Sequence, residues 1–250
     1  MRVPFRVFLF AGLTALALAG CQSLSGGESE VITQTLARTA ANSEANGEYE
    51  AAANQYRTLL DREPENRAAR LGLARNLRYS GNPKSAVQTL MEAGADKSGD
   101  GGLLLELGKD KIALAKADEA IGHLKDVVKT GAEDWEVYAA MGIAHDLLQS
   151  YDEAWTAYAK ALKLSPGNGQ VLNNMAISAA LNGKLDIAIN ILEQAPLPVR
   201  RTPQVRQNLA FFYGIRGDMT KAGNLAKMDL DKEAVRNNLA VFSRFRKGPR

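Results

Sequence analysis

The chain has 250 residues, with 31 Lys and Arg against 28 Asp and Glu. This near balance of charge excludes a strongly basic protein of the kind that binds nucleic acid. The only cysteine is Cys21, which excludes an internal disulfide framework and a cysteine-rich metal site.

The start of the chain has the features of a secretory signal. Arg2 and Arg6 make it basic, and residues 7–19 are a mostly apolar run without charge. Such a run is too short for an ordinary membrane-spanning helix and suits the core of a signal peptide. We therefore expect residues 1–20 to be a signal peptide. Its removal takes away two arginines, leaving 29 basic against 28 acidic residues.

The apolar run ends in Leu18-Ala19-Gly20-Cys21, which resembles the bacterial lipobox. The resemblance implies that the Cys21 thiol receives a diacylglyceryl group, that the chain is cut before it, and that the new amino group is acylated. Several acyl chains on one residue give stable anchoring. Gln22 stands where an Asp would retain an enteric lipoprotein in the inner membrane. This implies the outer membrane of a Gram-negative bacterium, with the protein on its periplasmic face. We expect residues 21–32 to be the lipidated cysteine and a flexible Ser/Gly/Glu tether.

Small residues recur in the rest of the chain with a period of 34. Steps of 34 from Ala154 reach only alanine: Ala52, Ala86, Ala120, Ala154, Ala188 and Ala222. Steps from Gly142 reach only Ala or Gly: Ala40, Ala74, Gly108, Gly142, Ala176 and Ala210. Small residues at the crossing of two helices let the backbones approach closely. A third column is mostly large and is expected to fill the space between repeats: Tyr56, Leu90, Leu124, Tyr158 and Leu192.

The stretch from Trp135 to Asn168 resembles a tetratricopeptide repeat (TPR), a helix–turn–helix unit with this same period. The resemblance implies an all-α, right-handed solenoid of six repeats that behaves as one elongated body. The repeats would span residues 33–66, 67–100, 101–134, 135–168, 169–202 and 203–236. Glycine stands at four of the turns between helices, as a left-handed helix end prefers: Gly47, Gly81, Gly183 and Gly217. Ala115 and Gln149 stand there in repeats three and four, so those turns could differ.

Two places depart from this regular pattern. Residues 97–102 are rich in Gly and Ser, so we expect the first helix of repeat three to start late, near Leu103. The segment beginning at Val205 recurs at Val235, a step of 30 instead of 34. We therefore expect the second helix of repeat six to be shortened, and residues 237–250 to form a capping helix over 237–246 and a tail.

In the TPR family, the first helix of each repeat lines a concave groove that takes an extended peptide or a short helix. The resemblance carries this role to ten residues: Arg75, Arg78, Lys109, Ile143, Asp146, Asn173, Asn174, Gln207, Asn208 and Phe211. Asparagine amides both donate and accept hydrogen bonds, so a ladder of them suits an extended peptide backbone. Asn is also common at these positions of TPR sequences in general, which gives the ladder a purely structural interpretation. The basic set that clamps a C-terminal carboxylate is incomplete.

The sequence holds no arrangement that indicates catalysis. Its two histidines, His123 and His145, form no His-x-x-x-His, Ser-His-Asp or Cys-His pattern. The segment Gly99-Asp100-Gly101-Gly102 lacks the Gly-Lys-Ser/Thr of a phosphate-binding loop. We expect no enzyme activity, no cofactor and no metal site.

The lipobox, the tether, the six repeats and the closing helix together resemble the TadD family of tight-adherence (Tad/Flp) pilus-assembly lipoproteins. The resemblance implies a pilotin-like role, in which the protein helps an outer-membrane secretin to localise or to multimerise. Type IV pilus pilotins are also six-repeat lipoproteins. Two alternatives are a periplasmic scaffold for cell-wall enzymes and a lipoprotein of outer-membrane protein assembly. The second class usually has fewer and longer repeats.

Overall fold

The structure is a computed structural model that describes residues 22–247, so the expected signal peptide and the candidate lipidation site Cys21 lie outside the described residues. The described chain forms fourteen helices. They are α1 (Gln22–Ala45), α2 (Tyr49–Arg62), α3 (Arg67–Tyr79), α4 (Pro83–Glu92), α5 (Gly101–Ala113), α6 (Ala117–Lys129), α7 (Trp135–Leu147), α8 (Tyr151–Leu164), α9 (Gly169–Leu181), α10 (Leu185–Glu193), α11 (Leu197–Arg200), α12 (Pro203–Arg216), α13 (Met219–Ala226) and α14 (Lys232–Lys247).

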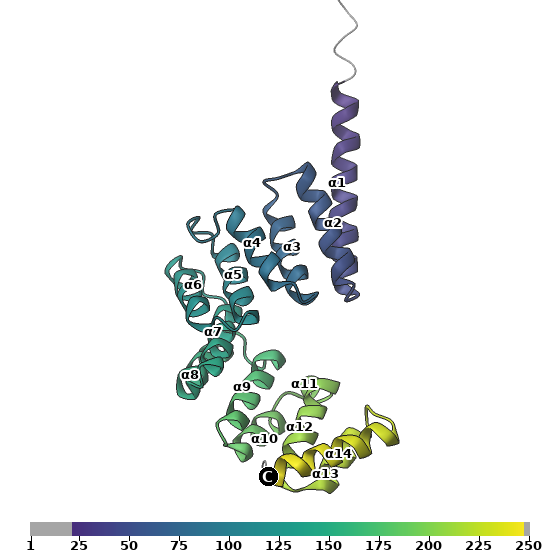
Figure 1. The fold of residues 1–250 in the computed structure, drawn as a ribbon, viewed down its shortest axis with the longest axis vertical. Helices are drawn as coiled ribbons and strands as arrows, with labels where there is room; N and C mark the ends of the chain where they lie inside the picture. Colours follow the sequence, from purple (N-terminus) through teal and green to yellow (C-terminus); the bar gives the residue numbers. More distant parts are fainter. Residues whose placement is uncertain (1–21, 248–250) are drawn as a thin grey trace, which may run out of the picture.

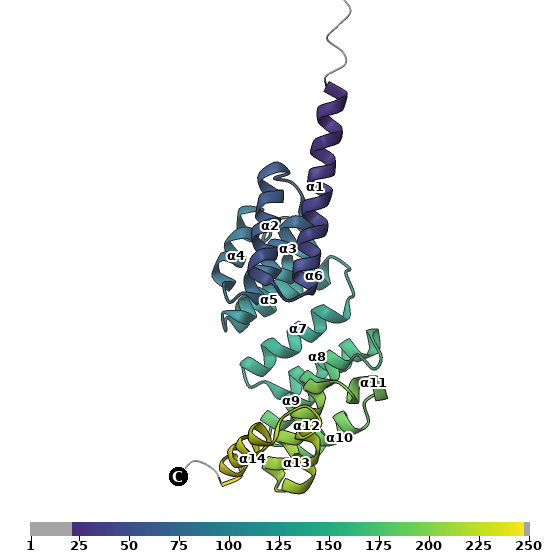
Figure 2. The same cartoon turned by 90° about the vertical axis from the view of Figure 1, so that its right-hand side faces the viewer.

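The helices follow one another along a curved arc, with α1 at one end and α14 at the other (Figure 1). Consecutive helices pack as pairs, and each pair packs on the next along the chain. A view from the side shows the same succession of helix pairs (Figure 2). The predicted all-α TPR solenoid is therefore confirmed.

Five first helices begin at the first residues of the predicted repeats two to six: α3 at Arg67, α5 at Gly101, α7 at Trp135, α9 at Gly169 and α12 at Pro203. The residue before each helix accepts a hydrogen bond from a backbone N–H of the first turn; these caps are Asn66, Asp100, Asp134, Asn168 and Thr202. Asn, Asp and Thr are favoured caps because they satisfy N–H groups that have no partner within the helix. A polar column with the period of the repeat thus marks where each repeat starts.

The cap also explains why one expectation is wrong. The Asp100 carboxylate accepts hydrogen bonds from the backbone N–H of Gly102 at 2.8 Å and of Leu103 at 3.1 Å. This capping lets α5 begin at Gly101, although the glycine-rich sequence predicts a start near Leu103.

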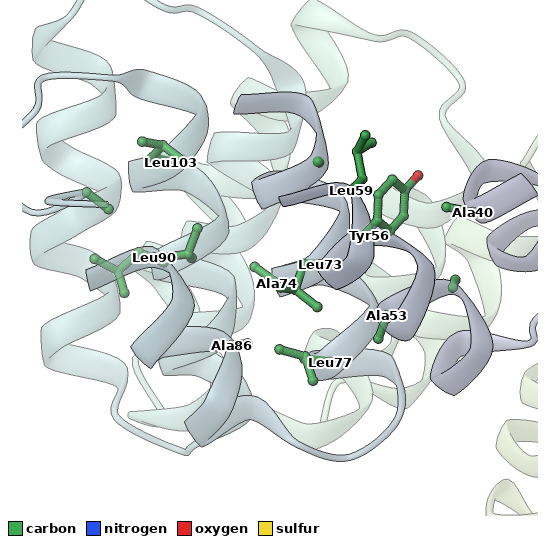
Figure 3. Close-up of a cluster of buried hydrophobic side chains, with 14 residues drawn as sticks. Ala40, Ala53, Tyr56, Leu59, Leu73, Ala74, Leu77, Ala86, Leu90 and Leu103 are labelled. Carbon is green, nitrogen blue, oxygen red and sulfur yellow. The ribbon is translucent and has the colours of Figure 1, made fainter. Parts of the chain in front are cut away.

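The column of alanines lies at the helix crossings and is completely buried. Ala52, Ala86, Ala120, Ala154, Ala188 and Ala222 all have 0% exposure. Figure 3 shows the packing in the first repeats, where the Tyr56 ring of α2 lies near Ala40 of α1. The two glycines of the neighbouring column leave room for large side chains. A Cβ at Gly142 would lie 2.5 Å from Cε1 of Tyr158, and one at Gly108 would lie 2.9 Å from the side chain of Leu124.

All six turns between paired helices share one backbone conformation. The four turn glycines have positive φ angles, and so do Ala115 (φ 56°) and Gln149 (φ 57°). The turns of repeats three and four therefore do not differ from the others. The left-handed conformation costs a residue with a Cβ about 1–2 kcal/mol. These two repeats tolerate that cost because the packing of the helices determines the turn.

The two ends of the described chain differ from expectation. Residues 22–32, predicted as a flexible tether, continue α1, which extends beyond α2 in Figure 1 with Val31 and Ile32 exposed. The helix can start early because no proline stands between Gln22 and Ala45. The capping helix α14 begins at Lys232 and not at residue 237, so residue 236, the predicted end of repeat six, lies inside it. Asp231 accepts a hydrogen bond from the backbone N–H of Ala234 at 2.8 Å and thereby caps α14.

The glycine at the crossing of α7 and α8 gives a stability prediction. Gly142→Ala places a methyl against the Tyr158 ring, whose hydroxyl donates to Asp146 at 2.7 Å and cannot easily move. We expect a loss of about 1–3 kcal/mol in the free energy of unfolding, measured by urea denaturation. Gly122→Ala is the matched control, because nothing lies within 4 Å of its Cβ position on α6. It should stabilise by about 0.5–1 kcal/mol through helix propensity. Equal effects of the two substitutions would contradict the proposed packing.

The strained turn of repeat three gives a second prediction. Ala115→Gly should raise the free energy of unfolding by about 0.5–1 kcal/mol, because glycine adopts a positive φ without a Cβ clash. Ala113→Gly, at the last residue of α5, makes the same chemical change where φ is helical and should lower the stability. The melting temperatures of the two variants should therefore move in opposite directions. A fall in both would show that Ala115 is not strained.

Candidate binding groove

A groove of about 550 Å³ lies across the first helices of successive repeats. Its walls come from α3, α5 and α7, with Glu44 of α1 at one end and Gln170 of α9 at the other. The polar residues of the lining are Glu44, Arg75, Arg78, Lys109, Glu136 and Gln170. The rest of the lining is mostly apolar, with Tyr79, Ile112, Ala113, Trp135, Ala139, Ala140 and Ile143. These side chains meet because the first helices recur once in every repeat and present equivalent faces.

The polar part of the lining is built around Arg78, whose side chain is only 10% exposed. Its guanidinium donates to Glu106 Oε2 at 2.7 Å and to Asp110 Oδ1 at 2.5 Å, both on α5. Such buried, charge-assisted hydrogen bonds hold both partners in fixed positions. Arg78 therefore ties α3 to α5 at the base of the groove.

Lys109 continues this network toward the next repeat. Its ammonium donates to Glu106 Oε1 at 3.1 Å and to Glu136 Oε2 of α7 at 2.5 Å. At the opposite end, Arg75 pairs with Glu44 of α1. The three basic residues that the resemblance places in the groove are thus all present, and each already has an acidic partner within the chain.

Burial and neighbouring charges change how these acids ionise. Burial raises the pKa of Asp110 to about 7, against the opposing effect of Arg78. Burial also opposes ionisation of Glu106, but Lys109 and Arg78 outweigh it and lower the pKa of Glu106. Asp110 Oδ2 is buried and has no hydrogen-bond partner among the described residues, so nothing there offsets the loss of water that an ionised carboxylate would suffer.

Ile143, also predicted for the groove, lines it, whereas the remaining predicted residues lie elsewhere. Asp146 accepts from the hydroxyls of Tyr158 at 2.7 Å and of Ser178 at 2.5 Å, so it joins repeats four and five. Burial raises the pKa of Asp146. Asn173 is 2% exposed, and its side-chain oxygen accepts from Asn208 at 2.6 Å. These contacts favour the structural interpretation of the Asn ladder at these two positions.

Repeat six is covered from its own end. Gln207 donates a hydrogen bond to Asp229 at 3.1 Å. Asn174, the predicted groove residue next to Asn173, lies on α9 of repeat five and is half-buried. The Phe211 ring meets Phe242 and Phe245 of α14 at centroid distances of 5.4 and 5.7 Å. The capping helix therefore occupies the space where a ligand would contact Phe211.

The sequence did not predict most of the apolar residues of the groove, or any of the acidic residues that pair with its cations. Ile112 and Glu136 line the groove, and Glu106 holds two of its cations. The helical period could have found them, because residues one or two turns apart share a face. Ile112 and Glu106 each lie one turn from Lys109 on α5, and Glu136 lies two turns before Ile143 on α7.

Two other kinds of site, a metal centre and a membrane span, are absent from residues 22–247. No three His, Cys, Asp or Glu side chains in this range are placed to hold a metal ion. No helix in the same range has both the length and the apolar character that a membrane span requires.

Comparison with known families agrees with this architecture. Residues 44–102 and residues 105–169 each match a tetratricopeptide-repeat family model. The chain is a tetratricopeptide-repeat protein. No curated protein has significant sequence similarity to this TPR protein.

Solved structures share the fold at low sequence identity. A TPR protein of Thermus thermophilus, TTC0263, is 21% identical with a TM-score of 0.67, over 72% of this chain and 98% of that one. PilW, a widely conserved type IV pilus biogenesis factor, is 14% identical with a TM-score of 0.70, over 85% and 99%. Pseudomonas aeruginosa pilF is 17% identical with a TM-score of 0.58, over 86% and 90%. At these identities the likeness concerns the TPR fold alone.

The unusual ionisation of Asp110 gives a pH prediction. Because the pKa of Asp110 is raised to about 7, the folded protein keeps this proton at pH values at which the unfolded chain has lost it. This contribution to stability is present below about pH 4 and is lost as the pH rises to about 7. Asp110→Asn removes the titration. Between about pH 5 and pH 8, the variant should therefore gain on the order of 2 kcal/mol relative to the unmodified protein.

The measurement is urea denaturation of both proteins at the two pH values. Asp61→Asn, at an exposed position of α2, is the control and should show no such relative gain. If Asp110→Asn also shows none, Asp110 is ionised throughout, and the pairing with Arg78 dominates over burial.

Proposed function

We propose that this TPR protein is a lipid-anchored scaffold of the outer membrane that binds an extended segment of a partner protein in the groove of α3, α5 and α7. The proposed assembly is a Tad/Flp, type IV-like pilus or secretion system. The partner is its secretin or another component of that system. The proposed role is to help the secretin reach the outer membrane or multimerise there.

The convergence of side chains from five first helices on one groove carries this proposal. Glu44, Arg78, Lys109, Trp135 and Gln170 come from α1, α3, α5, α7 and α9 and line one continuous surface. A ligand that contacts all of them must cross several repeats, which suits an extended segment better than a compact small molecule.

The internal pairing of the charges indicates which segment would fit. The cations at the base of the groove form ion pairs with Glu44, Glu106 and Glu136. A strongly charged ligand would have to compete with these partners. The exposed parts of Trp135, Ile112 and Ile143 instead offer apolar contact, so we expect a segment with large apolar side chains and few charges.

Two observations support the assembly and the anchor. The TPR fold of this chain covers 99% of PilW, a type IV pilus biogenesis factor. The sequence before Gln22 resembles a lipobox, and Gln22 begins α1, a helix of 24 residues that would be about 36 Å long. A helix attached directly to a lipidated cysteine would hold the repeats at a set distance from the membrane.

The proposal is tested by the amount of secretin multimer in outer membranes of cells with and without the protein. We expect the multimer to fall strongly in its absence, and Cys21→Ser to fail to restore it because the anchor is lost. An unchanged multimer would overturn the secretin role. Full restoration by Cys21→Ser would overturn the requirement for lipid.

The two tryptophans provide a matched test of the groove. Trp135→Ala removes the largest apolar side chain of the groove, whereas Trp155→Ala removes an exposed one, 40% exposed, on α8. Only Trp135→Ala should reduce the multimer, with the melting temperature of both variants as a folding control. A loss of about 2 kcal/mol or more in partner binding is typical of such an anchor. Equal activity of the two variants would exclude the groove as the binding site.

A further inference from the structure

The charge of this chain is divided sharply along its length. Residues 22–196 contain 17 Lys and Arg against 24 Asp and Glu, whereas residues 197–250 contain 12 against 4. The near neutrality of the whole chain therefore hides an acidic part and a strongly basic part. The basic part includes α11, α12, α13 and α14, which lie at the opposite end of the arc from α1 (Figure 1).

A second cleft, of about 440 Å³, lies in this basic part and is separate from the groove of α3, α5 and α7. It is formed between the end of α10, the short helix α11, and the pair α12 and α13. It shares no lining residue with the groove. Any ligand that it holds is therefore recognised by a different set of side chains.

The floor of the cleft is apolar. Leu209 and Tyr213 of α12 reach it from the core, and Leu225 of α13 is half-buried beside them. Two further apolar side chains at its edge are unusually exposed to solvent: Leu197 is 49% exposed and Met228 is 65% exposed. Exposed apolar side chains that line a cleft are typical of a binding site.

The second helices that border the cleft are short. α13 has 8 residues, against 14 in α8, and Met228, just after its end, stays largely exposed. On the other side, α10 ends at Glu193, and Pro196 and Pro198 turn the chain into α11.

The rim of the cleft carries cations without acidic partners. Arg200, Arg201 and Lys221 are exposed, and none of them forms an ion pair with another described residue. Lys221 lies over the Tyr213 ring, with its Nζ 4.8 Å from the ring centroid, but it meets no acid. The other two charged groups of the lining have ionic or hydrogen-bonding partners. Arg206 pairs with Asp229, and Glu193 accepts a hydrogen bond from the Tyr213 hydroxyl. The rim therefore presents a net positive charge above an apolar floor.

We propose that this cleft binds an acidic–apolar segment of a partner protein, in which Asp or Glu side chains alternate with large apolar ones. The apolar side chains would enter between Leu197, Leu225 and Met228. The carboxylates would meet Arg200, Arg201 and Lys221, whose charges are not neutralised within the described chain. A cleft of about 440 Å³ admits a few side chains, which suits a peptide segment. This site does not depend on the proposed function and would make the protein a two-site scaffold.

The test is fluorescence anisotropy with the purified full chain and a fluorescein-labelled mixture of octapeptides in which Asp or Glu alternates with Leu or Phe. The same mixture with Asn and Gln in place of the acids is the probe control. We expect the acidic mixture to bind and the amide mixture to bind at least about tenfold more weakly.

Two double variants of equal charge change separate the cleft from general electrostatic attraction. Arg200→Glu with Arg201→Glu should weaken binding of the acidic peptides by at least about tenfold. Lys125→Glu with Lys163→Glu, at exposed positions of α6 and α8 outside the cleft, should leave binding within about twofold. Both double variants change exposed side chains, and circular dichroism checks that they fold.

Any other outcome of these binding measurements overturns the proposal. No binding of the acidic mixture, or equal weakening by the two double variants, would exclude a specific peptide site. Binding to vesicles of phosphatidylglycerol that only Arg200→Glu with Arg201→Glu abolishes, with no peptide binding, would make the occupant a lipid surface. Concentration-dependent association in analytical ultracentrifugation, lost in the same variant and again without peptide binding, would make it the acidic part of a second copy.

Discussion

The close crossing of paired helices at Ala and Gly is the constraint on which the rest of the molecule depends. Six alanines in steps of 34 have no exposed surface, so the two backbones of each repeat meet at a separation that only a methyl group allows. Gly142 of α7 leaves room for the Tyr158 ring. The Tyr158 hydroxyl donates a hydrogen bond to Asp146, which accepts another from Ser178 in the next repeat. One small residue thus sets the distance within a repeat and the contact between repeats. Because the same crossing recurs along the arc, a change in its geometry would accumulate and alter the curvature of the groove.

The buried charges act on this scaffold in a different way. Ion pairs link α3, α5 and α7 through Arg78, Glu106, Lys109 and Glu136, and Arg78 also donates a hydrogen bond to Asp110. Replacing such pairs by apolar residues often costs no stability, because desolvation offsets the attraction between the charges. We therefore infer that the network serves mainly to fix the relative positions of three helices and to limit which ligands can enter. A segment that brings its own charges would displace partners that already satisfy one another.

The repeat pattern and the small columns predict the solenoid and the starts of five first helices from sequence, because period and residue size are local properties that packing then enforces. Other features depend on three-dimensional context. Ala115 and Gln149 adopt a left-handed conformation that their own preferences oppose, since the packing of the flanking helices determines the turn. The start of α14 at Lys232 follows from the shortened α13 and from the Asp231 cap, neither of which the repeated segment at Val235 reveals. Among the predicted groove residues, Arg75, Arg78 and Lys109 come together, whereas Phe211 is covered by α14. Helix period gives a residue's face, but it does not tell which neighbour covers that face.

The two surfaces of this TPR protein differ in the chemistry that would recognise a ligand, and this difference follows from where each lies in the repeats. The groove is built from complete repeats, in which every cation meets an acid on a neighbouring first helix, so its recognition rests on shape and apolar contact. The cleft lies beside short second helices, and Arg200 and Arg201 on its rim pair with no acid of the following helices. Incomplete repeats thus leave both apolar surface and charge uncovered at one end of the arc. A partner with an acidic segment would be repelled by residues 22–196 and attracted to residues 197–250, and at physiological salt this field acts over about 8 Å. Contact at the cleft would therefore orient such a partner before the groove is engaged, and two weak contacts held on one rigid body give a higher combined affinity than either alone.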